Sequence, residues 1–309
     1  ISYKNLQMLM KNNYYTEPFG LNKINMTLFK NYLSLIKFSH TIFALPFAMI
    51  GFFLASNDYG FEWSTLIHVI LCMIFARSAA MAFNRFIDRD IDLDNPRTAQ
   101  IREIPNGTIK PKSALQFVIF NSLAFVITSY FINTLCFYLS PIALLIILGY
   151  SYTKRFTSLC HLILGLGLSL APLGAFLAVS EQFSLTPIFF STAVLFWVSG
   201  FDIIYSLQDE KFDSKNQLHS IPAALGRKNS LLISRLLHIL TTFSLFYAGQ
   251  QLETKYMYWI GFSIFTLLLF YQHSLVSENN LSKVNFAFFT TNGIASIIFG
   301  VFVILELLF

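Results

Sequence analysis

The chain of 309 residues is 55% apolar and only 12% charged, whereas an average soluble domain has about 25% charged residues. With a mean hydropathy of +0.59 and 35 phenylalanines, it lacks the polar surface that a soluble enzyme of this length requires. The composition excludes a soluble globular protein, a disordered chain and a disulfide-rich secreted domain. It predicts an all-α polytopic membrane protein.

Nine apolar stretches approach the length of about 20 helical residues that crosses a bilayer. In chain order they are 33–56, 63–84, 114–133, 135–152, 158–179, 186–207, 229–249, 255–275 and 284–309. Residues 1–30 are polar and do not read as a signal peptide, so we expect them to form a cytoplasmic N-terminal extension. Residues 31–309 would then form one transmembrane domain.

Lysine and arginine lie almost entirely on the N-terminal segment and on every second connection between the spans. Because positive charge marks the cytoplasmic side of a membrane protein, this side, with the N-terminus, is expected to be cytoplasmic. The isoelectric point near 9.0 then follows from topology. We therefore expect a lipid bilayer as surroundings and no nucleic-acid partner.

Seven of the eight aspartates form two clusters, on the two longest basic connections. Each cluster repeats side chains four residues apart: Asn84, Asp88 and Asp92 in the first, Tyr205, Asp209 and Asp213 in the second. Residues at this spacing share a helical face, where like charges repel unless a cation neutralises them. Since Mg²⁺ prefers carboxylate and phosphate oxygens, two such helix ends indicate a clamp for a Mg²⁺-bridged diphosphate. The alternative is that these acids are solvated loop charges balanced by nearby bases.

Two basic residues near the clusters are candidates for holding phosphate oxygens. Arg97 follows the first cluster in the run Asn95-Pro-Arg-Thr98, and Lys154 follows the fourth span. A guanidinium binds a phosphate through two parallel hydrogen bonds, and an ammonium acts as a point charge.

The two clusters resemble the motifs of the UbiA superfamily of intramembrane prenyltransferases. The resemblance covers 31–309 and rests on Asn84-x3-Asp88-x3-Asp92 with Asn95-Pro-Arg-Thr98, and on Asp202-x2-Tyr205-x3-Asp209-x3-Asp213. Stretches 37–46, 77–84, 152–155 and 218–222 are similar to one branch, the 4-hydroxybenzoate polyprenyltransferases and the prenyltransferases of the futalosine route to menaquinone. The sequence departs from the family at Arg102, which comes four residues after Thr98 where the family usually has arginine three residues after.

The resemblance implies a nine-helix bundle around a central cavity that opens to the cytoplasm, in a bacterial inner membrane. It implies Mg²⁺-dependent transfer of a polyprenyl group from a polyprenyl diphosphate to an aromatic acid. The implied metal–diphosphate ligands are Asn84, Asp88, Asp92, Asp209 and Asp213, with Arg97 and Lys154 on phosphate oxygens and Tyr205 as a hydrogen-bonding phenol. Lys154 would offset charge on the leaving diphosphate, and Asp202 or Asp213 would orient the acceptor hydroxyl or take the ring proton.

An acceptor carboxylate needs a cation near the cytoplasmic mouth, and Lys37 and Arg77 are the candidates. Lys37 has an alternative role as an interfacial lysine, and Arg77 as a structural partner of a motif aspartate. We also expect Tyr150, at the end of the fourth span, to bind substrate. We assign packing roles to His68, His161 and His238, which lie within spans.

Two questions about function stay open at this point. The acceptor is expected to be 4-hydroxybenzoate, with 1,4-dihydroxy-6-naphthoate as the alternative. A transporter is the alternative from another class, because carboxylates within membranes often mark ion pathways. The acids gather at one membrane face, whereas transporter sites lie near the midplane, and this disfavours a transporter.

Overall fold

The computed structural model describes residues 30–36, 43–252 and 254–309.

Proline and asparagine residues begin several of the apolar helices. Proline occupies the first turn of α3 (Leu45–Tyr59), α6 (Pro111–Ile132) and α11 (Ile221–Gln251), where its missing N–H costs no hydrogen bond. Asn133 begins α7 (Thr134–Thr153) by accepting a hydrogen bond from the Cys136 N–H at 2.7 Å. The apolar runs that follow then continue as helices.

A helix lies on each of the nine predicted spans within the described part of the chain. Besides those above they are α4 (Trp63–Ile87), α8 (Cys160–Ser180), α9 (Leu185–Ser206), α12 (Tyr256–Ser274) and α13 (Asn292–Leu308), the last preceded by η3 (Phe286–Thr291). Seven of the helical segments in these ranges are long and apolar enough to cross a membrane, and α3 and α12 are not among them. Nine crossings therefore remain a prediction, as does the cytoplasmic position of the N-terminus, which lies outside the described residues.

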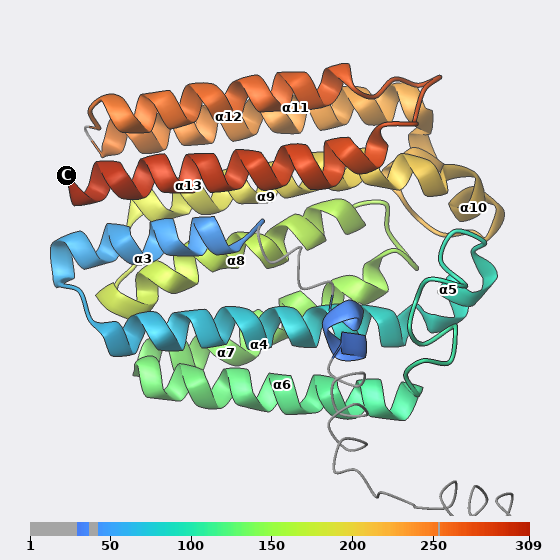
Figure 1. The fold of residues 1–309 in the computed structure, drawn as a ribbon, viewed down its shortest axis with the longest axis horizontal. Coiled ribbons are helices and arrows are strands. Elements are labelled where there is room, and N and C mark those ends of the chain that lie inside the picture. The colour runs from blue at the N-terminus through green and yellow to red at the C-terminus, as the bar shows by residue number, and fades with distance from the viewer. Residues whose placement is uncertain (1–29, 37–42, 253) are drawn as a thin grey trace, which may run out of the picture.

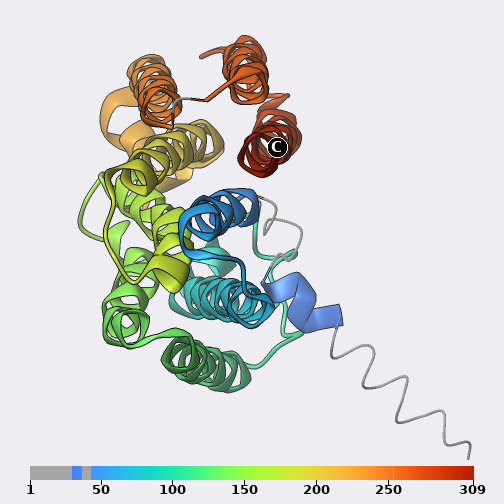
Figure 2. The same ribbon diagram turned by 90° about the vertical axis from the view of Figure 1, so that its left-hand side faces the viewer.

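The helices form a curved row that folds back on itself (Figure 2). Neighbours in the row pack in the order α4, α6, α7, α8, α9, α11, α12, α13 and α3, and α3 also packs against α8. An aromatic core joins α3 to the C-terminal helices: the ring centroid of Phe47 lies 5.4 Å from that of Trp197 and 5.8 Å from that of Phe299. A hydrogen bond of 3.0 Å from Trp197 Nε1 to Asn292 Oδ1 ties α9 to α13 within this core.

The outer faces of the helices carry large exposed apolar side chains. On α6 and α7 these include Phe120, Tyr130, Phe131 and Leu145. Helices α6 and α7 bury only 22% and 11% of their most apolar stretches inside the protein. So much apolar surface would associate or aggregate in water but is suited to hydrocarbon. The chain is an integral membrane protein.

Both aspartate clusters lie at the same end of the bundle, where the short helices α5 (Arg89–Asp94) and α10 (Glu210–Lys215) fold across the helix ends (Figure 1). The expectation of one continuous helical face through each cluster is wrong. Helix α4 ends before Asp88, and α9 gives way to the 3₁₀ turn η2 (Leu207–Asp209). The later carboxylate of each cluster has its own basic partner, Arg102 for Asp92 and Lys154 for Asp213, and these cations offset the repulsion between neighbouring carboxylates.

Candidate active site

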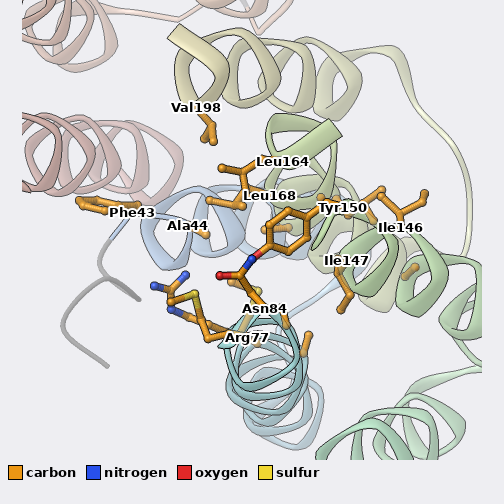
Figure 3. Close-up of a pocket in the computed structure, with 18 of the residues that line it drawn as sticks. Phe43, Ala44, Arg77, Asn84, Ile146, Ile147, Tyr150, Leu164, Leu168 and Val198 are labelled. Carbon is orange, nitrogen blue, oxygen red and sulfur yellow. The ribbon is translucent and has the colours of Figure 1, made fainter. Parts of the chain in front are cut away.

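A cavity of about 560 Å³ opens between α4, α7, α8 and α9. Its depth is apolar, with Ile147, Leu164, Leu168 and Val198 on the walls, as Figure 3 shows. Its mouth lies beside α5 and α10 and carries one motif carboxylate of each cluster, Asp88 and Asp209. A cavity with an apolar body and a charged mouth matches a long apolar ligand that has an anionic head.

In the first cluster, Asp88 faces the cavity. Asn84 Nδ2 donates to Asp88 Oδ2 at 2.9 Å, and Arg155 Nη2 lies 3.6 Å from Asp88 Oδ1. Oδ1 is buried and accepts no hydrogen bond from the described residues. Burial raises the pKa of Asp88 above its ordinary value, although Lys154 and Arg155 oppose the shift. An additional cation at Oδ1 would therefore favour the charged carboxylate.

Asp92 does not line the cavity, although the sequence pattern groups it with Asp88, and it pairs with Arg102, which does. Its Oδ2 accepts a hydrogen bond of 2.9 Å from Arg102 Nη1, and its main-chain oxygen accepts one from Thr98 Oγ1, also at 2.9 Å. Burial raises the pKa of Asp92 to about 7. Arg102 thus has a defined partner despite its shifted position in the motif.

In the second cluster, Asp209 is held by the segment that follows the first cluster. Arg97 Nε donates to Asp209 Oδ1 at 2.9 Å and Arg97 Nη2 donates to Oδ2, while Asn95 Nδ2 donates to Oδ1 at 3.1 Å. Arg97 Nη1 also donates to the Tyr205 hydroxyl at 3.0 Å. Burial lowers the pKa of the Arg97 guanidinium, but the contacts with Asp209 outweigh it and raise the pKa overall. Arg97 therefore stays charged and links the two clusters.

Asp213 lies behind Lys154 and does not line the cavity. The carboxylate is fully buried, and Lys154 Nζ lies 2.7 Å from its Oδ1. Burial lowers the pKa of Lys154, and attraction to Asp213 outweighs this and raises it. Four motif carboxylates thus each have a basic partner from another segment: Asp88 with Arg155, Asp92 with Arg102, Asp209 with Arg97 and Asp213 with Lys154.

The packing role assigned to His161 is incomplete. His161 lines the cavity beside Asp202, and its Nδ1 lies 2.7 Å from Asp202 Oδ2. Sequence reasoning missed this pair because α8 and α9 bring together residues 41 positions apart. The one available signal was a histidine in the first turn of a span.

The residues predicted to bind the acceptor differ in where they lie. Arg77 and Tyr150 both line the cavity and converge there with Asn84 (Figure 3), and Lys37 lies outside the described residues. The buried Nε of Arg77 has no hydrogen-bond partner among the described residues. Arg85, which the sequence did not single out, is also buried at the cavity, and its Nη1 donates to Asn84 Oδ1 at 3.3 Å.

The residues at the mouth fit Mg²⁺ bound together with a phosphorylated ligand. In the described part of the chain, no three His, Cys, Asp or Glu side chains gather closely enough to hold a metal ion by themselves. Mg²⁺ usually takes one or two carboxylates and completes its shell with water and substrate phosphates. Asp88 and Asp209 both line the cavity, and Oδ1 of Asp88 accepts no hydrogen bond from the described residues. The full ligand set of Asn84, Asp88, Asp92, Asp209 and Asp213 stays a prediction.

The sequence of the chain is similar to those of known proteins. The model of the UbiA prenyltransferase family matches residues 44–294. A protein of Aliivibrio fischeri named 4-hydroxybenzoate octaprenyltransferase is 30% identical over 241 residues, which are 77% of this chain and 82% of that protein. A protein of the same name from Vesicomyosocius okutanii is 31% identical over 80% of this chain and 89% of that protein.

Two solved structures share the fold. A UbiA homologue from Aeropyrum pernix superposes with a TM-score of 0.79 and 31% identity, over 86% of this chain and 98% of that chain. A UbiA homologue from Archaeoglobus fulgidus, bound to DMAPP and Mg²⁺, superposes with a TM-score of 0.70 and 19% identity, over 90% of this chain and 99% of that chain. The chain therefore belongs to the UbiA prenyltransferase family.

Proposed function

We propose that the chain transfers a polyprenyl group from a polyprenyl diphosphate to an aromatic acid in a Mg²⁺-dependent reaction, with 4-hydroxybenzoate as the acceptor. The observation that carries the proposal is the single cavity mouth at which Asp88, Asp209, Arg97 and Lys154 meet above an apolar depth. The names of the relatives support the acceptor class. The ligands of the Archaeoglobus homologue support a prenyl diphosphate and Mg²⁺.

The charged mouth is the expected position of the donor diphosphate, with the prenyl chain in the apolar depth. Asp88 and Asp209 would hold Mg²⁺ between them, and the metal would supply positive charge to the phosphate oxygens. Arg97 and Lys154 line the same mouth and would hold the remaining phosphate oxygens. Fixed positive charge in a water-poor site stabilises the negative charge that grows on a leaving diphosphate.

Aromatic rings beside the second cluster are suited to the allylic cation that remains. Tyr205, Phe288, Phe43 and Phe201 all line the cavity. The ring centroids of Tyr205 and Phe288 lie 4.3 Å apart, and Phe43 and Phe201 lie 5.7 Å and 5.2 Å from Phe288. Aromatic faces attract a cation through their quadrupoles without trapping it as a nucleophile would. The cluster therefore supports ionisation of the donor in this part of the cavity.

Arg77 and Asp202 suit the two polar groups of the acceptor. Arg77, on the cavity wall with an unpartnered Nε, would bind the carboxylate of the acid, with Tyr150 beside it. Asp202 would accept a hydrogen bond from the acceptor hydroxyl. Once the bond from the prenyl C1 to the diphosphate oxygen has broken, the ring carbon beside the hydroxyl bonds to C1 of the allylic cation, and the ring proton passes to the Asp202 carboxylate.

The test is a transfer assay with purified protein in lipid, a radiolabelled polyprenyl diphosphate and Mg²⁺. 4-Hydroxybenzoate and 1,4-dihydroxy-6-naphthoate are offered in parallel. The proposal predicts a prenylated 4-hydroxybenzoate whose formation EDTA stops. Prenylation of the naphthoate alone would move the chain to the menaquinone route. Transport of an ion or solute, with no turnover of the diphosphate, would overturn the proposal in favour of the transporter.

A further inference from the structure

We infer that His161 is the positioning residue for Asp202, so that the carboxylate presents one defined oxygen to the aromatic acceptor. The inference rests on the proposed function, because it takes Asp202 as the group that meets the acceptor hydroxyl. It adds a residue of α8 to a polar site whose other proposed members come from α4, α7, α9 and the connections that follow them.

The hydrogen bonds of His161 define which ring nitrogen carries its proton. The main-chain N–H of Ile221 donates to His161 Nε2 at 3.3 Å, so Nε2 is an acceptor. In a neutral imidazole the proton then lies on Nδ1, which is 2.7 Å from Asp202 Oδ2 and donates to it. His161 is only 3% exposed, so water does not compete for either nitrogen.

The partner of Nε2 is itself fixed by the start of a helix. Ile221 is the first residue of α11, and the first N–H groups of a helix have no partner within the helix. Pro222 has no N–H, and Ser220 Oγ accepts the N–H of Ala223 at 3.3 Å, which leaves the Ile221 N–H for His161. The positive end of α11 also disfavours a proton on Nε2. The helix start therefore holds the imidazole in one tautomer and orientation.

Asp202 lies where such orientation matters. It lines the cavity on α9, one turn from Tyr205, and thus lies between the charged mouth and the apolar depth. His161 engages Oδ2, and no described residue donates a hydrogen bond to Oδ1. The Asp202 side chain is 22% exposed, compared with 3% for His161, so the carboxylate is the accessible member of the pair. Holding Oδ2 leaves Oδ1 as the oxygen available to a hydroxyl in the cavity.

The experiment compares substitutions that keep or remove the two hydrogen bonds. In His161→Gln the amide can donate to Asp202 and accept from Ile221, whereas His161→Leu can do neither. His161→Asn keeps an amide that is too short to reach both partners. His238→Leu is the matched control, because His238 is a buried histidine with two hydrogen bonds, to His273 and to Trp197, and does not line the cavity.

Steady-state kinetics are measured for each variant against the acceptor and against the prenyl diphosphate, with thermal unfolding as a check of folding. We expect kcat/KM for the acceptor to fall about 10- to 100-fold in His161→Leu, by analogy with the loss of residues that orient the ligands of a metal ion. His161→Gln should restore most of this loss, and KM for the diphosphate should not change. With Asp202→Asn already present, His161→Leu should cause little further loss, because coupled residues are not additive.

Three results would overturn the inference while the proposed function stands. They are equal acceptor kinetics in His161→Leu and His238→Leu, an equal loss in His161→Gln and His161→Leu, and full additivity with Asp202→Asn. If His161→Leu does not fold, the comparison of His161→Asn with His161→Gln decides instead, and equal kinetics in those two would contradict it. Failure of the wild-type protein to prenylate any aromatic acid would instead reject the proposed function.

Discussion

Arg97 and Asp209 are 112 residues apart in the chain, and they form a two-pronged ion pair in which Arg97 Nε and Nη2 each donate to one oxygen of the carboxylate. The pair joins the segment after the first aspartate cluster to the end of α9. A further bond from Arg97 Nη1 to the Tyr205 hydroxyl, at 3.0 Å, makes this guanidinium the centre of the cavity mouth. The two clusters, expected to face each other across a diphosphate site, are thus joined by an arginine as well as lined by carboxylates.

Replacing Arg97 with lysine tests whether the paired hydrogen bonds of the guanidinium contribute to binding of the diphosphate. An ammonium keeps the charge but cannot span both oxygens of Asp209 and the Tyr205 hydroxyl. Losing even one charge-assisted hydrogen bond of about 1.5 kcal/mol corresponds to about a tenfold effect, so we expect KM for the prenyl diphosphate to rise at least that much. Arg89→Lys is the control, because Arg89 is partly exposed and does not line the cavity. Equal KM values in the two variants would contradict a role for the guanidinium fork.

Two substitutions of Tyr205 separate its hydroxyl from its ring. Tyr205→Phe loses only the bond to Arg97 and keeps the ring against Phe288, whereas Tyr205→Leu loses the aromatic face as well. A cation–π contact in a desolvated site contributes about 2 kcal/mol, so we expect kcat to fall about 30-fold more in Tyr205→Leu than in Tyr205→Phe. Turnover under saturating substrates measures this difference. The same kcat in both variants would show that the ring does not stabilise the allylic cation.

Arg77 is expected to select acceptors that carry a carboxylate. Arg77→Gln should raise KM for 4-hydroxybenzoate while KM for the donor stays the same. A hydrogen bond to a charged group contributes about 1.5–3 kcal/mol, so the increase should be about 10- to 100-fold. The methyl ester of the acid should be a poor acceptor for the wild-type protein, and Arg77→Gln should lose that discrimination.

Arg235→Gln serves as the matched control for Arg77, because Arg235 also lies within a predicted span but is exposed on the outer face and does not line the cavity. Unchanged discrimination in Arg77→Gln, or the same change in both variants, would assign Arg77 the structural role that the sequence left open.

Much of the fold could be predicted from the sequence because membrane helices are defined by local composition. The helices, and the meeting of both aspartate clusters at one end, follow from apolar length and from alternating charge. The breaks at Asp88 and at η2 could not be predicted from the apolar pattern, and neither could the partners of the carboxylates there, because Arg155 and Arg97 come from distant segments.

Partners from distant segments were also the reason why the positions of individual side chains in the site could not be predicted. Four-residue spacing placed Asp92 with Asp88 and Asp213 with Asp209, but the later carboxylates do not line the cavity and pair instead with Arg102 and Lys154, which do. His161 was assigned to packing because its partner Asp202 lies on another helix. Spacing along one helix indicates which residues are neighbours on that helix, and it contains no information about the facing helix.

Close packing of α3 against α8 gives a prediction of stability. A Cβ added at Gly51 would collide with the main-chain oxygen of Pro172, so Gly51→Ala must push the two helices apart. Overpacking of this kind costs about 1–3 kcal/mol, and thermal unfolding in detergent should show a lower Tm. Gly149→Ala is the control, because nothing lies within 4 Å of its added Cβ and alanine favours a helix. A Tm for Gly51→Ala equal to that of Gly149→Ala would contradict the close approach.

The central claim is that Asp88 and Asp209, from opposite clusters, jointly hold the diphosphate through Mg²⁺. It is tested most directly by measuring the affinity of a non-reactive prenyl thiolodiphosphate with and without Mg²⁺, in the wild-type protein and in Asp88→Asn, Asp209→Asn and Asp90→Asn. Asp90 belongs to the first cluster, but its side chain is 79% exposed, so it controls for a change of charge alone. We predict that Mg²⁺ strengthens binding in the wild type and in Asp90→Asn and has little effect in the other two variants. The same Mg²⁺-dependent affinity in all four proteins would contradict the claim.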